Sequence, residues 1–358
     1  MTGSRTPILL LTGFLGSGKT TLLNQWLRTP SLADAAVIVN EFGDIGIDGD
    51  LIAASDESTI ELTTGCLCCT VRGDLVETLQ DLVLRQRRGD IRTLSRVVIE
   101  TTGLADPAPV IQALMTMPVA RDYRLDCIVT AVEAPQGLAT LDRHAEAVKQ
   151  AAVADAIVVT KTDLAPGGFA DLAARLRSLN PGASLLEAAP GAPPDPAALV
   201  HGGVHDGAAG AQAAQAWLRA DAFPRHGPGD GPGDGDGPDA HDHHARHDAA
   251  ISSFCLTFDE PLVWQEVAAW LDALVIAHGE DMLRIKGILD VEGRGEPIVV
   301  QAVQKLFHPP FALDAWPRGW RRSRIVFITR GIPEPFVREV FDVIRSARSR
   351  APSASLAI

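Results

Sequence analysis

A glycine-rich segment near the N-terminus constrains the fold more than any other part of the chain. Residues 13–20 read GFLGSGKT, which matches the phosphate-binding pattern G-x-x-x-x-G-K-[ST]. Glycines let backbone N–H groups curl around phosphate oxygens, while Lys19 should reach the β- and γ-phosphates and the Thr20 hydroxyl should bind Mg²⁺. The segment follows a predicted strand at 8–12 and opens a predicted helix at 20–27. The sequence therefore predicts a P-loop nucleotide hydrolase. The expected nucleotide contacts in this segment are Gly13, Gly16, Ser17, Gly18, Lys19, Thr20 and Thr21.

An acidic residue at the end of another apolar strand completes the expected phosphate site. Residues 97–103 read VVIETTG, so Glu100 ends a strand and Gly103 follows shortly after it. A P-loop enzyme needs a carboxylate at the end of a neighbouring strand, close to its metal ion. We therefore expect Lys19, Thr20 and Glu100 to organise the phosphates and Mg²⁺, and the backbone N–H of Gly103 to approach the γ-phosphate.

Apolar runs alternate with helical patterns through the first 190 or so residues, which predicts an α/β fold with a doubly wound parallel sheet for a domain at 1–222. The runs are continuously apolar, so both faces of the sheet should be covered by helices. Strands are expected at 8–12, 36–40, 97–100, 127–132, 157–160 and 184–187, and helices at 20–27, 72–86, 141–152, 168–178 and 211–218.

The composition changes sharply after this P-loop domain. Residues 223–250 are rich in His, Asp and Gly and cannot bury enough apolar surface to offset their ordering entropy, so we expect a flexible linker. Residues 251–350 should form a smaller α+β domain. Its strands are expected at 252–258, 283–289, 298–303 and 325–329, and its helices at 262–278 and 335–346.

Charge and hydropathy exclude two classes of partner. The formal net charge of −13 argues against a dedicated nucleic-acid binder, which needs a basic surface. No segment approaches the roughly 18 consecutive apolar residues of a membrane span, and the apolar run at 8–11 is too short for a secretory signal. We expect a cytoplasmic protein that binds neither nucleic acid nor membrane.

Three closely spaced cysteines give the second chemical signal. Residues 65–69 read GCLCC, which places Cys66, Cys68 and Cys69 in one loop. Thiolates select Zn²⁺, Cu(I) or similarly thiophilic ions over Mg²⁺ and Ca²⁺. A tetrahedral zinc site needs four ligands, which one short loop rarely supplies alone. We expect some of these thiols to bind a transition metal, with a carboxylate, a histidine or water completing the shell.

Several motifs occur together in one order. They are GFLGSGKTTLLN at 13–24, NEFG at 40–43, GCLCC at 65–69, ETTG at 100–103 and TKTD at 160–163. In this order they resemble the CobW/COG0523 family of metal-linked P-loop GTPases, which includes cobalt and zinc metallochaperones and nitrile hydratase activators. RIKGIL at 284–289 and QAVQKLFH at 301–308 resemble the C-terminal domain of that family, so the resemblance covers the whole chain.

The resemblance assigns roles that the residues alone do not. Glu41 and Asp44 would belong to a nucleotide-responsive switch at 40–44, which lies close to the cysteine loop in the family. Glu41 is then a candidate carboxylate ligand of the transition metal. Asp44 is a candidate catalytic residue, although a loop aspartate that only solvates its backbone is an equal alternative. The family implies GTP, Mg²⁺ and Zn²⁺ or Co²⁺, with a client metalloprotein or metal-inserting enzyme as partner; a homodimer is one possible assembly.

The base-reading motif departs from the family pattern. GTPases generally carry Asn-Lys-x-Asp where this chain has Thr160, Lys161, Thr162 and Asp163. Asp163 can accept hydrogen bonds from guanine N1–H and N2–H₂, which adenine cannot supply, and Lys161 is expected to contact the nucleotide as well. An Asn at position 160 would bond the base edge, whereas Thr160 offers only a hydroxyl. We therefore favour GTP and keep ATP as the competing nucleotide.

Histidines concentrate in the predicted linker. Seven of the ten lie between His201 and His247. Imidazole and carboxylate ligands suit Zn²⁺, Co²⁺ and Ni²⁺, so the tract either collects metal for the cysteine site or is a spacer without function. The metal-binding candidates in it are His241, His243, His244 and His247.

Two functions fit these features. The leading hypothesis is a GTP hydrolase that couples its nucleotide state to the binding and delivery of Zn²⁺ or Co²⁺ to a client. The rival is a zinc buffer or storage protein with vestigial hydrolysis, in which the histidine tract binds the metal. One tight, nucleotide-dependent ion would favour the first, and several weak, nucleotide-independent ions would favour the second.

Overall fold

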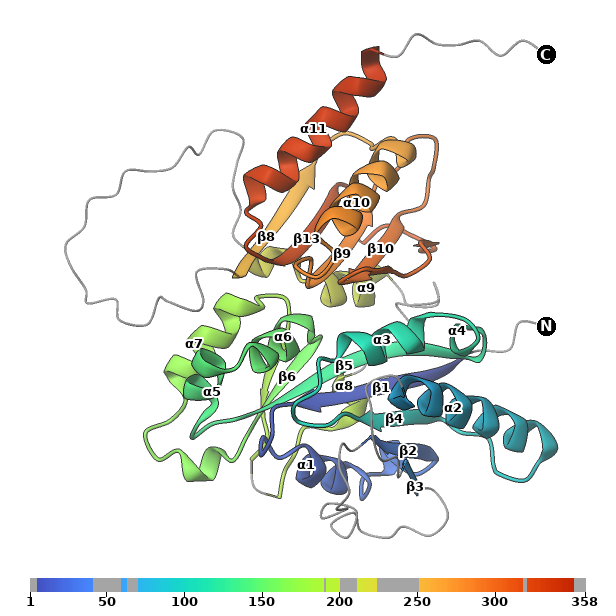
Figure 1. Ribbon diagram of the computed structural model, residues 1–358, viewed down its shortest axis with the longest axis vertical. Helices are drawn as coiled ribbons and strands as arrows, with labels where there is room; N and C mark the ends of the chain where they lie inside the picture. The colour runs from blue at the N-terminus through green and yellow to red at the C-terminus, as the bar shows by residue number, and fades with distance from the viewer. Residues whose placement is uncertain are drawn as a thin grey trace. The chain divides into compact units, whose positions relative to one another are not determined.

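The computed structural model describes residues 5–40, 59–62, 70–189, 191–199, 211–223, 251–317 and 321–350. The chain divides into two compact units, Met1–Arg219 and Ala220–Ile358. Each unit has its own sheet (Figure 1). The predicted linker at 223–250 lies, apart from Phe223, outside the described residues, so the predicted domain limits stay a prediction.

The first unit is built on a seven-stranded parallel sheet in the order β3-β2-β4-β1-β5-β6-β7. The prediction of a doubly wound α/β fold is confirmed, and helices lie on both faces of the sheet (Figure 1). The central strand β1 pairs with β4 on one side and with β5 on the other. The strands are β1 (Thr6–Gly13), β2 (Ala35–Asn40), β3 (Thr59–Leu62), β4 (Arg96–Glu100), β5 (Tyr123–Glu133), β6 (Ala156–Thr160) and β7 (Ser184–Glu187).

The helix after β1 closes one face of this sheet. Leu23 and Trp26 of that helix pack with Leu9 and Leu11 of β1 in one buried cluster. The indole of Trp26 is fully buried, and its Nε1 donates a hydrogen bond to the Pro194 carbonyl at 2.8 Å. The helices of this unit are α1 (Lys19–Trp26), α2 (Thr70–Arg88), α3 (Ala108–Met115), α4 (Val119–Asp122), α5 (Gly137–Arg143), α6 (Ala145–Val153), α7 (Ala170–Leu179), α8 (Pro196–Leu199) and α9 (Ala211–Leu218).

The single helix predicted at 141–152 is wrong. The segment forms the end of α5 and all but the last residue of α6, and His144 between them has an extended backbone with φ −127° and ψ 109°. No proline or glycine marks this break in the sequence. The imidazole of His144 stacks on the Phe14 ring with a centroid separation of 4.4 Å, so the break coincides with a contact to the glycine-rich loop.

The second unit is an antiparallel sheet covered by two helices, which confirms the predicted α+β domain. Its strands are ordered β11-β10-β9-β13-β8, with β12 paired to β10, and α10 and α11 lie side by side on it (Figure 1). Trp270 lies in the core of this unit. Its ring centroid is 4.8 Å from that of Phe341 and 5.6 Å from that of Phe327. The elements are β8 (Ile251–Phe258), α10 (Trp264–His278), β9 (Arg284–Leu289), β10 (Ile298–Val303), β11 (Leu306–Phe307), β12 (Phe311–Ala312), β13 (Ser323–Arg330) and α11 (Glu334–Arg350).

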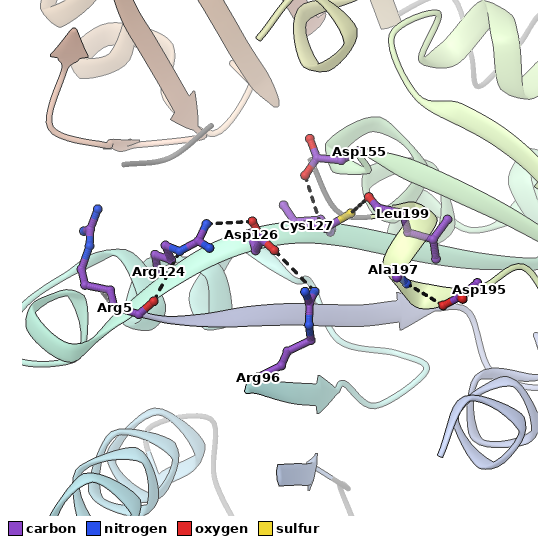
Figure 2. A network of polar contacts seen from close by, with 10 residues as sticks. Arg5, Arg96, Arg124, Asp126, Cys127, Asp155, Asp195, Ala197 and Leu199 are labelled. Carbon is purple, nitrogen blue, oxygen red and sulfur yellow. Dashed lines mark hydrogen bonds and ion pairs between the residues drawn. The ribbon is translucent and has the colours of Figure 1, made fainter. Parts of the chain in front are cut away.

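A buried ionic network joins strands on either side of β1 (Figure 2). Asp126 of β5 is fully buried and accepts from Arg124 at 3.0 Å and from Arg96 of β4 at 3.4 Å. Burial lowers the pKa of Arg96, and the Asp126 carboxylate acts in the opposite direction. Arg124 Nε also donates to the Arg5 carbonyl at 3.4 Å, so the network reaches the start of the chain. Removing one partner would leave charges uncompensated in the sheet.

We predict that Asp126→Ala lowers the free energy of unfolding of the first unit by about 3 kcal/mol, because two largely buried guanidinium groups lose their carboxylate. Urea unfolding followed by circular dichroism measures the change. Asp34→Ala is the control, since the Arg92–Asp34 pair is 61% and 52% exposed and should contribute less than about 1 kcal/mol. Equal unfolding midpoints for the two variants would contradict the prediction.

Candidate nucleotide and metal site

The glycine-rich segment forms a tight loop between β1 and α1. Gly13 has φ 144° and Gly18 has φ 87°, backbone conformations that L side chains rarely adopt. A Cβ at Gly13 would also overlap the carbonyl oxygen of Ala131. The Ser17 N–H donates to the Phe14 carbonyl at 3.0 Å, which closes the loop. The first N–H groups of α1 follow directly, so both the loop and the helix end can bind phosphate.

Three side chains meet where β1 and β4 end. Lys19 is 8% exposed, and its Nζ donates to the Phe14 carbonyl at 3.3 Å. The Thr20 hydroxyl donates to Glu100 Oε1 at 2.7 Å. Glu100, the last residue of β4, pairs with Leu11, and β1 continues two residues further to Gly13, where the P-loop begins. A hydroxyl and a carboxylate oxygen are ligands that suit Mg²⁺, and these residues therefore fit the ion that nucleotide hydrolysis needs.

The chain after Glu100 stays against the P-loop. The Thr101 N–H donates to the Leu11 carbonyl, and its hydroxyl donates to Thr12 Oγ1, both at 2.9 Å. A Cβ at Gly103 would lie 2.5 Å from Leu15 Cα, so only glycine permits this approach. The buried Thr102 hydroxyl has no hydrogen-bond partner among the residues that the structure describes. It is a polar group that the sequence analysis did not single out.

The TKTD motif at 160–163 begins at the last residue of β6 and touches the P-loop. The Thr160 hydroxyl is buried and donates to the Ser17 carbonyl at 2.6 Å. Lys161 has a left-handed backbone, φ 53°, and its Nζ binds Glu133 Oε2 at 2.7 Å. Asp163 is exposed in the short 3-10 helix Thr162–Leu164. The Thr160 hydroxyl thus stabilises the P-loop by a hydrogen bond. Glu133, which the sequence analysis missed, binds the Lys161 ammonium group.

The structure gathers these predicted residues at the carboxyl edge of the sheet, where ligands bind in open α/β folds. The predicted transition-metal residues cannot be placed in the same way. Within the described ranges, no group of three or more His, Cys, Asp or Glu residues could hold a metal ion. The predicted residues outside those ranges are Glu41, Asp44, Cys66, Cys68, Cys69, His241, His243, His244 and His247.

The other two cysteines do not offer thiolates. Cys127 lies buried in β5, and its Sγ donates to the Leu199 carbonyl at 3.1 Å (Figure 2). Burial raises the pKa of the Cys255 thiol to about 11. Cys255 is therefore protonated at neutral pH, where a metal ligand must be ionised.

Comparison with known proteins gives the family. The CobW/HypB/UreG nucleotide-binding domain matches residues 7–187, and the cobalamin synthesis protein CobW C-terminal domain matches residues 251–345. The chain belongs to the CobW family. By fold and family this CobW-family protein is a P-loop GTPase. In the described part of the chain, no helix combines the length and apolar character that crossing a bilayer requires.

Relatives of the CobW-family protein match it along most of their length. The zinc chaperone YjiA of Escherichia coli (strain K12) is 31% identical over 343 residues, which cover 94% of this chain and 98% of the relative. The zinc chaperone CobW of Pseudomonas aeruginosa is 33% identical over 359 residues, with 91% and 88% covered. The crystal structure of Zn(II)-bound YjiA GTPase from E. coli matches with a TM-score of 0.66 at 26% identity, covering 96% of this chain and 99% of that one.

We predict that Lys19→Ala weakens nucleotide binding at least about tenfold and abolishes turnover, because a charged hydrogen-bond donor to the phosphates is lost. Titration with a fluorescent GDP analogue and phosphate release measure the two effects. Far-ultraviolet circular dichroism serves as the control and should match that of the parent protein. Parental turnover in purified Lys19→Ala would show that this loop is not the phosphate site.

We predict that Thr160→Val lowers GTP affinity about fivefold, because the Ser17 carbonyl loses the hydroxyl that holds this part of the P-loop. Thr160→Ser keeps the hydroxyl and should stay close to the parent protein. Thr160→Asn should, if anything, sharpen the preference for GTP over ATP. Calorimetric titration with both nucleotides measures all three. Unchanged GTP affinity in Thr160→Val would mean that the 2.6 Å contact has no effect on the site.

Proposed function

We propose that this CobW-family protein hydrolyses GTP and couples its nucleotide state to the binding of zinc and its delivery to a client protein. One observation carries the coupling. β2 ends at Asn40 and β3 at Leu62, and these two residues are paired in neighbouring parallel strands. The carboxyl ends of parallel strands lie at one edge of a sheet, here the edge that carries the P-loop. The chain therefore leaves both strands at the phosphate edge, toward the switch motif after β2 and the cysteine motif after β3.

Hydrolysis would depend on positioning and charge. Lys19 would bind the β- and γ-phosphates, and Thr20 and Glu100 would hold Mg²⁺, which supplies charge neutralisation on the phosphate oxygens when bound. The N–H of Gly103 would face the γ-phosphate. Asp44 is the candidate for orienting the attacking water. Asp163 would select guanine, with Lys161 held beside the base by Glu133.

Zinc is the proposed cargo. The chaperone relatives are named for zinc, and three thiols are the soft ligands that zinc accepts. Cobalt fits the same donors and stays the alternative cargo. Cys66, Cys68 and Cys69 would hold the ion, with Glu41 as a further ligand. The histidines of residues 241–247 would collect metal for this site.

The coupling follows from the shared edge. A γ-phosphate would order the segment after β2, as phosphate contacts order switch segments in other GTPases. That segment would present Glu41 to the thiols, so GTP would raise metal affinity and hydrolysis would lower it. The effect is reciprocal, since a ligand that favours one state raises the affinity for every other ligand of that state.

The setting and the partner follow from this chemistry. A reducing cytoplasm keeps the three thiols free to bind metal. The client would be a metalloprotein or a metal-inserting enzyme, because release after hydrolysis needs an acceptor. A homodimer is the assembly to test first by sedimentation.

We predict that Cys66→Ser, Cys68→Ser and Cys69→Ser each weaken Zn²⁺ or Co²⁺ binding, because a hydroxyl is a poor soft ligand. Binding to the parent protein should release protons, since thiols of ordinary pKa near 8.5 must ionise. The thiolate-to-Co²⁺ charge-transfer band measures ligation directly. This band should strengthen with Mg²⁺ and GTP and weaken after conversion to GDP.

Matched variants separate the coupled chaperone from the buffer. Cys255→Ser removes a buried core thiol and should leave the band unchanged. Lys19→Ala should keep the metal site but lose the nucleotide effect. Equal metal affinity with GTP, GDP and no nucleotide would overturn the coupling and favour the zinc buffer. Loss of the tight ion on removal of residues 226–248 would favour the buffer as well.

A further inference from the structure

Helix α6 begins at a contact with the P-loop. Its first residue is preceded by His144, whose ring stacks on Phe14 at 4.4 Å with an interplanar angle of 29°. Phe14 lies in the P-loop, and its carbonyl accepts from both the Ser17 N–H and Lys19 Nζ. The start of α6 is therefore adjacent to the backbone that should cradle the phosphates.

Gln150 of α6 binds the loop that follows Glu100. Its side chain is fully buried, and Nε2 donates to the Gly103 carbonyl at 3.3 Å and to the Ala105 carbonyl at 3.0 Å. The backbone carbonyl of Gln150 accepts from the Thr130 hydroxyl at 2.7 Å, which fixes α6 to β5. One amide group thus fixes the middle of a loop that has no regular secondary structure of its own.

Lys149 fixes the end of the same loop. Its Nζ binds Asp106 Oδ2 at 2.8 Å, and the two side chains are 24% and 30% exposed. The other oxygen of Asp106 accepts from the Ala108 N–H at 2.9 Å, at the start of α3. The loop at 101–107 is therefore bound to β1 at its start and to adjacent residues of α6 at its middle and end.

A small pocket lies between the P-loop and α6. Ser17 and Gln150 both line it, and their buried atoms Oγ and Oε1 have no hydrogen-bond partner in the described part of the chain. The pocket has room for about one water molecule.

We propose that Lys149 and Gln150 are positioning residues for GTP hydrolysis. They hold the loop at 101–107 against the P-loop, so that the Gly103 N–H and the Thr102 hydroxyl keep their places at the terminal phosphate. A displacement of about 1 Å at such a group can cost a large factor in rate. GDP has no γ-phosphate that could contact this loop. The affinity of the protein for GDP therefore does not depend on Lys149 and Gln150. The inference rests on the proposed GTP hydrolysis and assigns residues to it.

The test separates turnover from binding. Gln150→Met keeps the side-chain length and removes both amide donors, and Lys149→Met removes an ion pair whose side chains are only partly exposed. Each should lower kcat for GTP about tenfold, while Kd for a fluorescent GDP analogue stays within about twofold of the parent value. Lys149→Arg restores the cation and should return kcat to within about threefold. Thermal unfolding of Lys149→Met should match the parent protein, which separates positioning from loss of fold.

Lys305→Met is the matched control, because Lys305 forms an exposed ion pair with Glu280 in the second unit. Its kcat should equal that of the parent protein. Parental kcat in both Gln150→Met and Lys149→Met would overturn the inference while leaving GTP hydrolysis established. Parallel loss of kcat, GDP affinity and melting temperature in Lys149→Met would also overturn it, since that pattern indicates a general structural role. A parent protein that binds GTP without hydrolysing it would overturn the proposed function as well.

Discussion

The hydrogen bond between the Thr20 hydroxyl and the Glu100 carboxylate joins two parts of the chain that are distant in sequence. It exists because β1 and β4 are neighbouring parallel strands, with Leu11 opposite Glu100 and β1 continuing two residues further to Gly13. That register places the first turn of α1 next to the last residue of β4. The approach of Gly103 to the P-loop depends on the same register, because Gly103 follows Glu100 by three residues.

Much of this arrangement could be predicted from the sequence. The P-loop pattern fixes a strand, a turn and a helix in order, and the apolar run before Glu100 identifies a second strand that ends in a carboxylate. Such signals are local, because each depends on a few adjacent residues. The glycine positions in the loop are predictable in the same way, because the positive φ of Gly18 is a backbone angle that other residues rarely adopt.

Tertiary contacts account for what could not be predicted. The break at His144 has no local signal, since it coincides with a stacking contact to a ring more than a hundred positions away in the sequence. The hydrogen bond from the Thr160 hydroxyl to the Ser17 carbonyl could not be predicted either, because these two residues are also distant in the sequence. β3 is short and has polar residues at two of its four positions, so its sequence resembles a loop. The anchoring of the loop at 101–107 by Gln150 depends on the packing of α6 against that loop, which no local pattern specifies.

The separate core of the second unit has a consequence for how the chain unfolds. Trp270, Phe327 and Phe341 pack with one another, and the indole N–H of Trp270 donates within the same unit to the Val337 carbonyl. The buried cluster around β1 is likewise made only of residues of the first unit. The two units can therefore unfold in separate steps, because loss of one core leaves the contacts within the other core in place.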